Sequence, residues 1–135
     1  MTRNEGPSPH SAQLTEEQVY SVLRNVASVL SYIHSDLGLS HGDVYLHNVL
    51  RDGQFTARLS DWGASFVYNR EDIELAGTFE RVEVLAFGHL FQDLVEWHRV
   101  ELTKEMKLFL DSITQAEQAS RPNFREIVDK LGPQH

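Results

Sequence analysis

The sequence has no cysteine among its 135 residues. This absence excludes disulfides, thiolate nucleophiles, cysteine-ligated zinc and iron–sulfur clusters. The sequence also has no apolar run near the roughly 20 residues that cross a bilayer. The start of the chain, Met1–Ser11, does not have the basic-then-apolar form of a signal peptide. Together these absences predict a soluble, cytoplasmic protein without membrane contacts.

Positive charge is scarce, because 12 Lys and Arg face 20 Asp and Glu and leave a net charge of −8. A chain this acidic repels phosphate backbones, so nucleic acid is not the expected partner. Hydrophobic residues make up 41% and charged residues 24%, which is ordinary for a globular domain and argues against disorder of the whole chain. The length suits one domain.

The first half of the chain predicts a flexible tail followed by one long helix. Residues 1–13 contain glycine, proline and small polar residues without an apolar period. An apolar residue then recurs every three or four positions from Val19 to Leu37, which predicts an amphipathic helix packed on a core. Thr15 and Gln18 have the spacing of a capping box, and Gly38 stands where a helix C-cap glycine is expected.

The rest of the chain predicts a hairpin and further helices. Residues 49–60 alternate around a turn at Arg51–Gln54, which is typical of a β-hairpin. Residues 64–81 have no clear period and are interpreted as a long surface segment. Three apolar stretches after it predict helices, the last with a capping box: 84–97, 106–113 and 123–131. The expected domain therefore covers residues 14–131, and residues 132–135 form a C-terminal tail.

Two short strings carry the chemistry: HGDVYLHN at residues 41–48 and SDWG at residues 60–63. Asp43 and Asn48 share the first string, and Asp61 follows Asp43 by eighteen residues across the hairpin. Because a hairpin brings its two ends together, these side chains are expected to converge. Oxygen donors of this kind suit Mg²⁺, which keeps positions for phosphate and water. The remaining carboxylate is able to accept or orient a proton.

This arrangement resembles the protein-kinase superfamily, in which a His-x-Asp-x-x-x-x-Asn loop is followed, after a hairpin, by Asp-Phe-Gly. The resemblance implies that Asp43 is the catalytic aspartate. It implies that Asn48 and Asp61 bind ATP through Mg²⁺, and that His41 braces the loop. Trp62 takes the place of the phenylalanine.

Two strings further along the chain extend the resemblance to residues 14–131. EVLAFG at residues 83–88 resembles the start of the central kinase helix, and this implies that Glu83 holds the catalytic loop by its backbone N–H groups. SRPNF at residues 120–124 resembles the entry to the final helix. There Arg121 is expected to pair with Glu80 or Glu83, because a buried arginine needs a carboxylate. The sequence resembles most closely bacterial kinase domains attached to leucine-rich repeats.

The pattern departs from the family at several points. Gly42 replaces the arginine that receives a phosphorylated activation loop, and Tyr45 replaces a lysine that contacts the transferred phosphate. Before Thr15 there is no Gly-rich strand and no strand with the ATP-binding lysine. The expected fold is therefore mainly α with a small β-hairpin region, the large C-terminal lobe without the N-lobe. Its uncovered face implies an N-lobe-like partner or a homodimer.

The resemblance implies transfer of a phosphoryl group from ATP to a hydroxyl of a protein substrate, impaired or dependent on a partner without the N-lobe. Two alternatives stay open. Gly42 and Trp62 also fit a fragment of a small-molecule kinase of the aminoglycoside or choline type. The lobe also fits a non-catalytic pseudokinase interaction module, since fold does not determine function.

Overall fold

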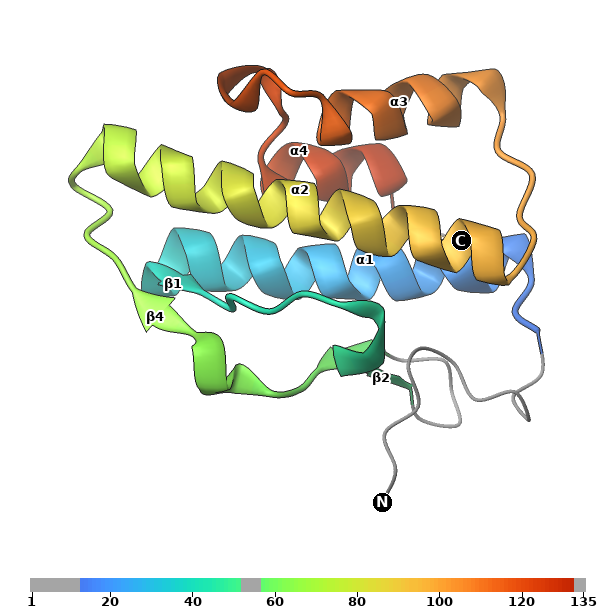
Figure 1. The fold of residues 1–135 in the computed structure, drawn as a ribbon, viewed down its shortest axis with the longest axis horizontal. Helices are drawn as coiled ribbons and strands as arrows, with labels where there is room; N and C mark the ends of the chain where they lie inside the picture. Colours follow the sequence, from blue (N-terminus) through green and yellow to red (C-terminus); the bar gives the residue numbers. More distant parts are fainter. Residues whose placement is uncertain (1–12, 52–56, 133–135) are drawn as a thin grey trace.

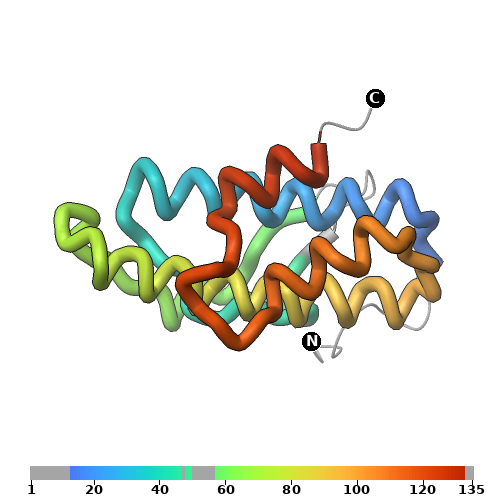
Figure 2. The backbone as a smooth tube through the Cα atoms, turned by 90° about the horizontal axis from the view of Figure 1, so that it is seen from above, coloured from blue at the N-terminus to red at the C-terminus, as the bar shows by residue number. Residues whose placement is uncertain are grey.

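The computed structural model describes residues 13–51 and 57–132. Two long helices lie side by side, α1 (Glu16–Tyr32) and α2 (Ile73–Trp97). Two shorter helices, α3 (Lys104–Thr114) and α4 (Phe124–Leu131), cover them on one side (Figures 1 and 2). The loops and short strands lie along the other side of this helical layer (Figure 1). The described chain is therefore mainly helical, as predicted.

The strands form two small antiparallel pairs. The hairpin β2 (Val49–Arg51) with β3 (Ala57–Leu59) confirms the predicted one, and Val49 lies opposite Leu59. The second pair, β1 (Leu39–Ser40) with β4 (Phe66–Val67), was not predicted. Each of its strands has two residues, which is too short for an alternating pattern to be recognised.

The predicted caps of α1 and α4 are present. The side chain of Thr15 accepts a hydrogen bond from the backbone N–H of Gln18, and the Gln18 side chain accepts one in return from the Thr15 N–H. Asn123 and Glu126 make the same reciprocal pair at the start of α4. The last turn of the first helix, Ile33–Leu37, widens into a π-helical turn that ends at a left-handed Gly38.

The interpretation of residues 64–81 as a long surface segment is wrong beyond residue 72, because α2 begins at Ile73 rather than near residue 84. The Asp72 side chain caps its first turn by accepting a hydrogen bond from the Leu75 N–H. These first turns project past the core and expose their apolar residues, with Ile73 82% exposed. Exposed apolar residues hide the period that marks a helix packed on one side.

The core lies between the four helices. Phe87 and Phe91 on α2 are fully buried and meet edge to face. Phe91 packs in the same way against Tyr20 of α1, and Phe87 against Phe124 of α4. These contacts join α1, α2 and α4 around one aromatic centre.

Three predictions fall mostly on residues outside the described ranges: the tail at 1–13, the hairpin turn at 51–54, and the C-terminal tail at 132–135. Within the ranges that the structure describes, no helix is both long and apolar enough to cross a membrane.

Candidate active site

The HGDVYLHN loop at residues 41–48 connects β1 to β2 and runs past the middle of α2 (Figure 1). Its turn depends on Gly42, whose φ of +86° is rarely adopted by residues with a side chain. A Cβ atom at this position would lie 2.4 Å from the carbonyl oxygen of Ala64. The arginine found here in most kinases therefore does not fit this backbone.

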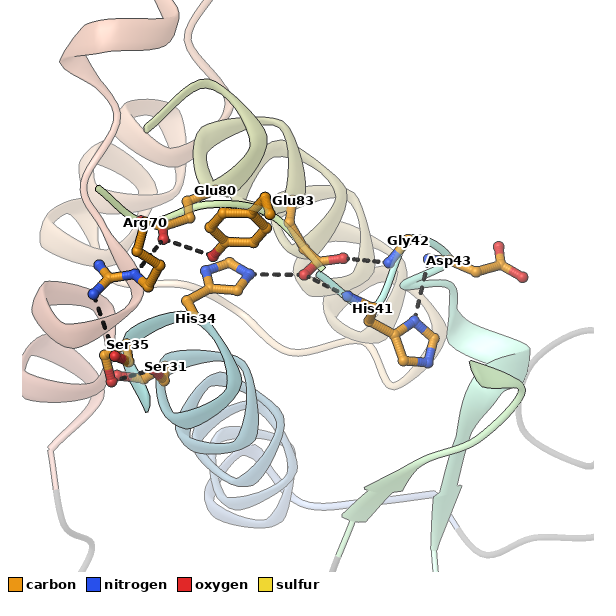
Figure 3. A network of polar contacts seen from close by, with 10 residues as sticks. Ser31, His34, Ser35, His41, Gly42, Asp43, Arg70, Glu80 and Glu83 are labelled. Atoms are coloured by element: carbon orange, nitrogen blue, oxygen red, sulfur yellow. Dashed lines mark hydrogen bonds and ion pairs between the residues drawn. The ribbon is translucent and has the colours of Figure 1, made fainter. Parts of the chain in front are cut away.

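Glu83 of α2 holds the loop by its backbone. One carboxylate oxygen accepts a hydrogen bond of 3.0 Å from the His41 N–H, and the other accepts one of 2.7 Å from the Gly42 N–H. The His34 ring, from the π-helical turn after α1, contacts the same carboxylate at 2.8 Å. Figure 3 shows this line of contacts from His34 through Glu83 to the loop. Three segments of the chain therefore meet at one buried carboxylate.

The environment of Glu83 keeps it ionised. Burial by itself would raise the pKa of this carboxyl, because a charge in a poor solvent is unfavourable. The hydrogen bonds from His34, Gly42 and His41 act against burial, and together they lower the pKa of Glu83 below its ordinary value. The anchor of the loop is thus a charged acceptor at neutral pH, which strengthens each hydrogen bond that it receives.

His41 is completely buried and links the loop to the end of the hairpin. Its Nδ1 atom accepts a hydrogen bond from the Asp43 N–H at 3.1 Å. This leaves the proton of a neutral ring on Nε2, which donates to the Ser60 carbonyl at 2.9 Å. The Trp62 ring packs edge to face on the imidazole, with centroids 4.4 Å apart. Both ring nitrogens are thus engaged, so His41 is a structural brace.

The hairpin brings Asn48 and Asp61 to the same end. Ser60, which precedes Asp61, donates from its backbone N–H and from its hydroxyl to the Asn48 carbonyl, at 2.8 and 3.1 Å. The Asn48 amide group in turn donates to the Asp43 carbonyl at 2.8 Å. These three hydrogen bonds tie the backbones next to the three candidate functional side chains into one unit.

The three candidate side chains differ in their surroundings. Asp43 is partly buried and Asp61 is exposed, in a left-handed backbone conformation with φ of +60° that aspartate tolerates. Asn48 is fully buried, and among the residues that the structure describes its Oδ1 atom has no hydrogen-bond partner. An unpaired buried carbonyl oxygen is unfavourable, and a bound water or ion is one of the groups that can satisfy it.

A hollow of about 270 Å³ opens beside Asp43. Polar groups come from the loop, and the opposite wall is apolar, with Phe66 from β4 and Phe79 and Val82 from α2. Neither Asn48 nor Asp61 lines it. Asp43 therefore borders an apolar space, whereas Asn48 and Asp61 lie at the hairpin, outside that space.

The prediction that Arg121 pairs with a carboxylate is wrong. In the described part of the chain no carboxylate lies within 4.0 Å of its guanidinium. Arg121 instead donates to two backbone carbonyls, those of Gln115 at 2.8 Å and Arg81 at 2.9 Å. The two predicted partners are engaged elsewhere, since Glu83 holds the loop and Glu80 receives the Tyr68 hydroxyl at 2.6 Å. Backbone carbonyls are sufficient acceptors for a buried guanidinium.

Sequence reasoning missed His34 and the contacts of Glu80. His34 lies on the predicted first helix, and its position there does not indicate which carboxylate it meets. Glu80 joins Tyr68 and Arg70, and Arg70 also donates to the carbonyl of Ser35 (Figure 3). Burial, followed by the hydrogen bond to Glu80, raises the pKa of Tyr68. These contacts fasten the segment after β4 to the end of the first helix.

Comparison with curated proteins finds plant receptor kinases and an animal one. The chain is 33% identical over 113 residues to the L-type lectin-domain containing receptor kinase V.5 of Arabidopsis thaliana, a match covering 69% of this chain and 17% of the relative. It is 32% identical over 115 residues to the putative kinase V.8 of that series, covering 81% and 16%. It is 41% identical over 56 residues to the Ephrin type-A receptor 8 of Mus musculus, covering 42% and 6%.

These similarities relate the chain to protein kinases. The chain spans less than a fifth of the length of each of these relatives. No family model matches the sequence. The expected likeness to bacterial kinase domains is not supported, and the relatives named above come from a plant and a mouse.

Proposed function

We propose that this chain is the catalytic-loop lobe of a protein-kinase-like phosphotransferase, which moves the terminal phosphoryl group of ATP to a protein hydroxyl. The observation that carries the proposal is the anchored loop. Glu83 and His41 accept hydrogen bonds from the backbone N–H groups of residues 41–43, Asn48 donates to the Asp43 carbonyl, and the hairpin joins Asn48 to the residue before Asp61. Phosphoryl transfer depends mainly on positioning and charge, so rigid placement of these groups is what the reaction requires.

The donor set fits Mg²⁺. The unpaired oxygen of Asn48 and the exposed carboxylate of Asp61 lie at one end of the hairpin and are the oxygen ligands that this ion prefers. In the described residues no group of three or more His, Cys, Asp or Glu side chains is placed so that it could hold a metal ion by itself. This fits an ion held by two side chains together with phosphate oxygens, rather than by an all-protein cage. When bound, the ion would neutralise charge on the phosphates.

Asp43 is the residue that acts on the acceptor. Its backbone is held by His41, and its side chain borders the apolar hollow of about 270 Å³. A hydroxyl group that enters from this side reaches a carboxylate able to orient it and accept its proton. The lobe that holds the remaining phosphate contacts comes from a longer chain or from a partner, either an N-lobe-like protein or a second copy.

The first experiment measures binding of ATP by calorimetry, with and without Mg²⁺, to the whole chain. We expect Mg²⁺-dependent binding that Asp61→Asn abolishes. Asp111→Asn, which removes an exposed carboxylate on α3, serves as the matched control and should bind like wild type. Absence of any Mg²⁺-dependent heat would contradict the proposal and favour a non-catalytic module.

The second experiment measures phosphoryl transfer to a mixed protein substrate. Asp43→Asn should keep ATP binding and lose about 10²- to 10⁴-fold in rate, the usual contribution of a general base. Equal rates for wild type and Asp43→Asn would remove Asp43 from the mechanism. Transfer to an amino-alcohol or an amino-sugar, without transfer to protein, would show that the lobe belongs to a small-molecule kinase.

A further inference from the structure

Two buried glutamates lie about one turn apart on α2, Glu80 and Glu83 (Figure 3). Glu83 holds the catalytic loop that carries Asp43. Glu80 holds the segment that follows β4, because its carboxylate accepts a hydrogen bond of 2.6 Å from the Tyr68 hydroxyl. The catalytic loop and this segment both contribute to the hollow beside Asp43. Neighbouring turns of one helix therefore fix both of the segments that border it.

The backbone by itself fixes the segment after β4 only weakly. β4 and β1 pair over two residues each, and the Tyr68 N–H donates to the Gly38 carbonyl at 2.8 Å. The buried side chains of Tyr68 and Glu80 add a contact with α2. Arg70 contacts the same Glu80 oxygen at 3.4 Å and donates to the Ser35 carbonyl at 3.2 Å. These side chains tie the segment to two helical elements.

The segment held in this way carries one wall of the hollow. Phe66 of β4 meets Phe79 of α2 edge to face, with ring centroids 5.0 Å apart, and the Tyr68 ring lies 5.7 Å from Phe79. Phe66 is 40% exposed, so it contributes less to the buried core than the fully buried Phe87. A buried hydrogen bond that fixes an exposed aromatic side chain indicates a role at the hollow rather than in the core.

Tyr68 also contacts the anchor of the catalytic loop. Its ring lies edge to face with the His34 ring at a centroid distance of 6.3 Å, and His34 contacts Glu83 at 2.8 Å. Neither Asn48 nor Asp61 takes part in these contacts. The contacts of Tyr68 therefore lie on the side of the hollow and not on the side of the proposed Mg²⁺ ligands.

We propose that Tyr68 and Glu80 are positioning residues for the acceptor of phosphoryl transfer. Their hydrogen bond keeps the Phe66 wall at a fixed distance from Asp43, and this distance determines which hydroxyl-bearing group reaches the Asp43 carboxylate. Because the wall is apolar, the selected acceptor carries its hydroxyl next to apolar groups. The inference rests on the proposed function, in which the acceptor enters through this hollow.

NMR of the whole chain under native conditions tests whether the pair positions the wall. Tyr68→Phe removes the hydroxyl and keeps the ring. We expect the proton contact between the Phe66 and Phe79 rings to be lost. The contact between Phe87 and Phe124 in the core should stay as in wild type. A variant that loses only stability keeps both contacts while it is folded, so an unchanged Phe66–Phe79 contact overturns the proposal.

Steady-state kinetics test the effect on transfer. In Tyr68→Phe, the KM for the protein substrate should rise about three- to tenfold, within the range of one net hydrogen bond, while calorimetric binding of ATP with Mg²⁺ stays as in wild type. An unchanged KM for the protein substrate overturns the inference and leaves the phosphotransfer proposal in place. Absence of ATP binding or of transfer in wild type instead contradicts the phosphotransfer proposal, and the acceptor role of the pair falls with it.

Two variants of Glu80 separate the hydrogen bond from packing. The carbonyl oxygen of glutamine is still able to accept from the Tyr68 hydroxyl, so Glu80→Gln should raise the KM for the protein substrate less than Glu80→Ala does. Glu96→Gln, which changes an exposed glutamate near the other end of α2, is the matched control and should leave the KM unchanged. Equal KM values in the two Glu80 variants overturn the role of the hydrogen bond. Where Glu80→Ala does not fold, Tyr68→Phe decides.

Discussion

Replacing Glu83 by glutamine removes a charge but keeps almost the same side-chain shape. The substitution therefore tests how the Glu83 carboxylate anchors the catalytic loop. Glu83 is 4% exposed and meets three groups: the His34 ring on one oxygen together with the His41 N–H, and the Gly42 N–H on the other oxygen. In its best orientation, the carbonyl oxygen of glutamine replaces the first oxygen and its amide group faces the Gly42 N–H. Two donors then oppose each other.

The magnitude follows from these contacts. The stranded N–H of Gly42 costs about 1–3 kcal/mol, and each of the two remaining hydrogen bonds loses about 1 kcal/mol when its acceptor becomes neutral. Glu83→Gln should therefore lower the free energy of unfolding by about 3–5 kcal/mol, a large share of the 5–15 kcal/mol typical of a domain.

Urea unfolding at pH 7, followed by circular dichroism, measures this loss of stability. Amide hydrogen exchange at His41 and Gly42 should accelerate in the same variant, because their acceptor has changed. Glu71→Gln is the control, with an expected change within about 0.5 kcal/mol. A loss below about 1 kcal/mol in Glu83→Gln, with unchanged exchange at both amides, would refute the reasoning.

Three further predictions concern the stability of the protein at acid pH and after replacement of two glycines. Because the pKa of Glu83 lies below its ordinary 4.5 when folded, its contribution to stability is complete above pH 4.5 and is lost as the pH falls through the folded-state value. Unfolding in urea at stepped pH should thus show the advantage of wild type over Glu83→Gln shrinking in acid, and a constant advantage would contradict this. Gly42→Ala should cost about 1–3 kcal/mol, because of its φ of +86° and the Ala64 oxygen 2.4 Å from the new Cβ; an unchanged urea midpoint would oppose this. Gly88→Ala should destabilise the protein by a similar amount, about 1–3 kcal/mol, and so lower its melting temperature. Although alanine favours helices, its Cβ would lie 2.5 Å from Thr114 on α3. A higher melting temperature would show that α3 moves aside without cost.

Local signals predicted much of the fold. The capping boxes at Thr15 and Asn123, the left-handed Gly38 and the hairpin from residue 49 to 59 depend on residues close together in the sequence, and the structure confirms them. The start of α2 was missed for the opposite reason. Its first turns extend into solvent, so the apolar residues there follow no core-facing period.

The sequence indicated the candidate residues but not their contacts. The alternation of residues 49–60 predicted the hairpin, and its register joins the backbones near Asp43, Asn48 and Asp61. The predicted partner of Arg121 was wrong, since a guanidinium can donate to backbone carbonyls as well as to carboxylates, and the sequence does not show which acceptors lie within its reach.

The sequence by itself determined which residue types stand in which order: an acidic, cysteine-free chain with apolar stripes for its helices and two strings that resemble kinase motifs. Only the tertiary structure decided that His34 and the loop meet at the buried carboxylate of Glu83. The physical reason is distance along the chain. Periodicity and caps depend on neighbours within a turn or two, whereas His34 and Glu83 are 49 residues apart and meet only when α1 and α2 pack together.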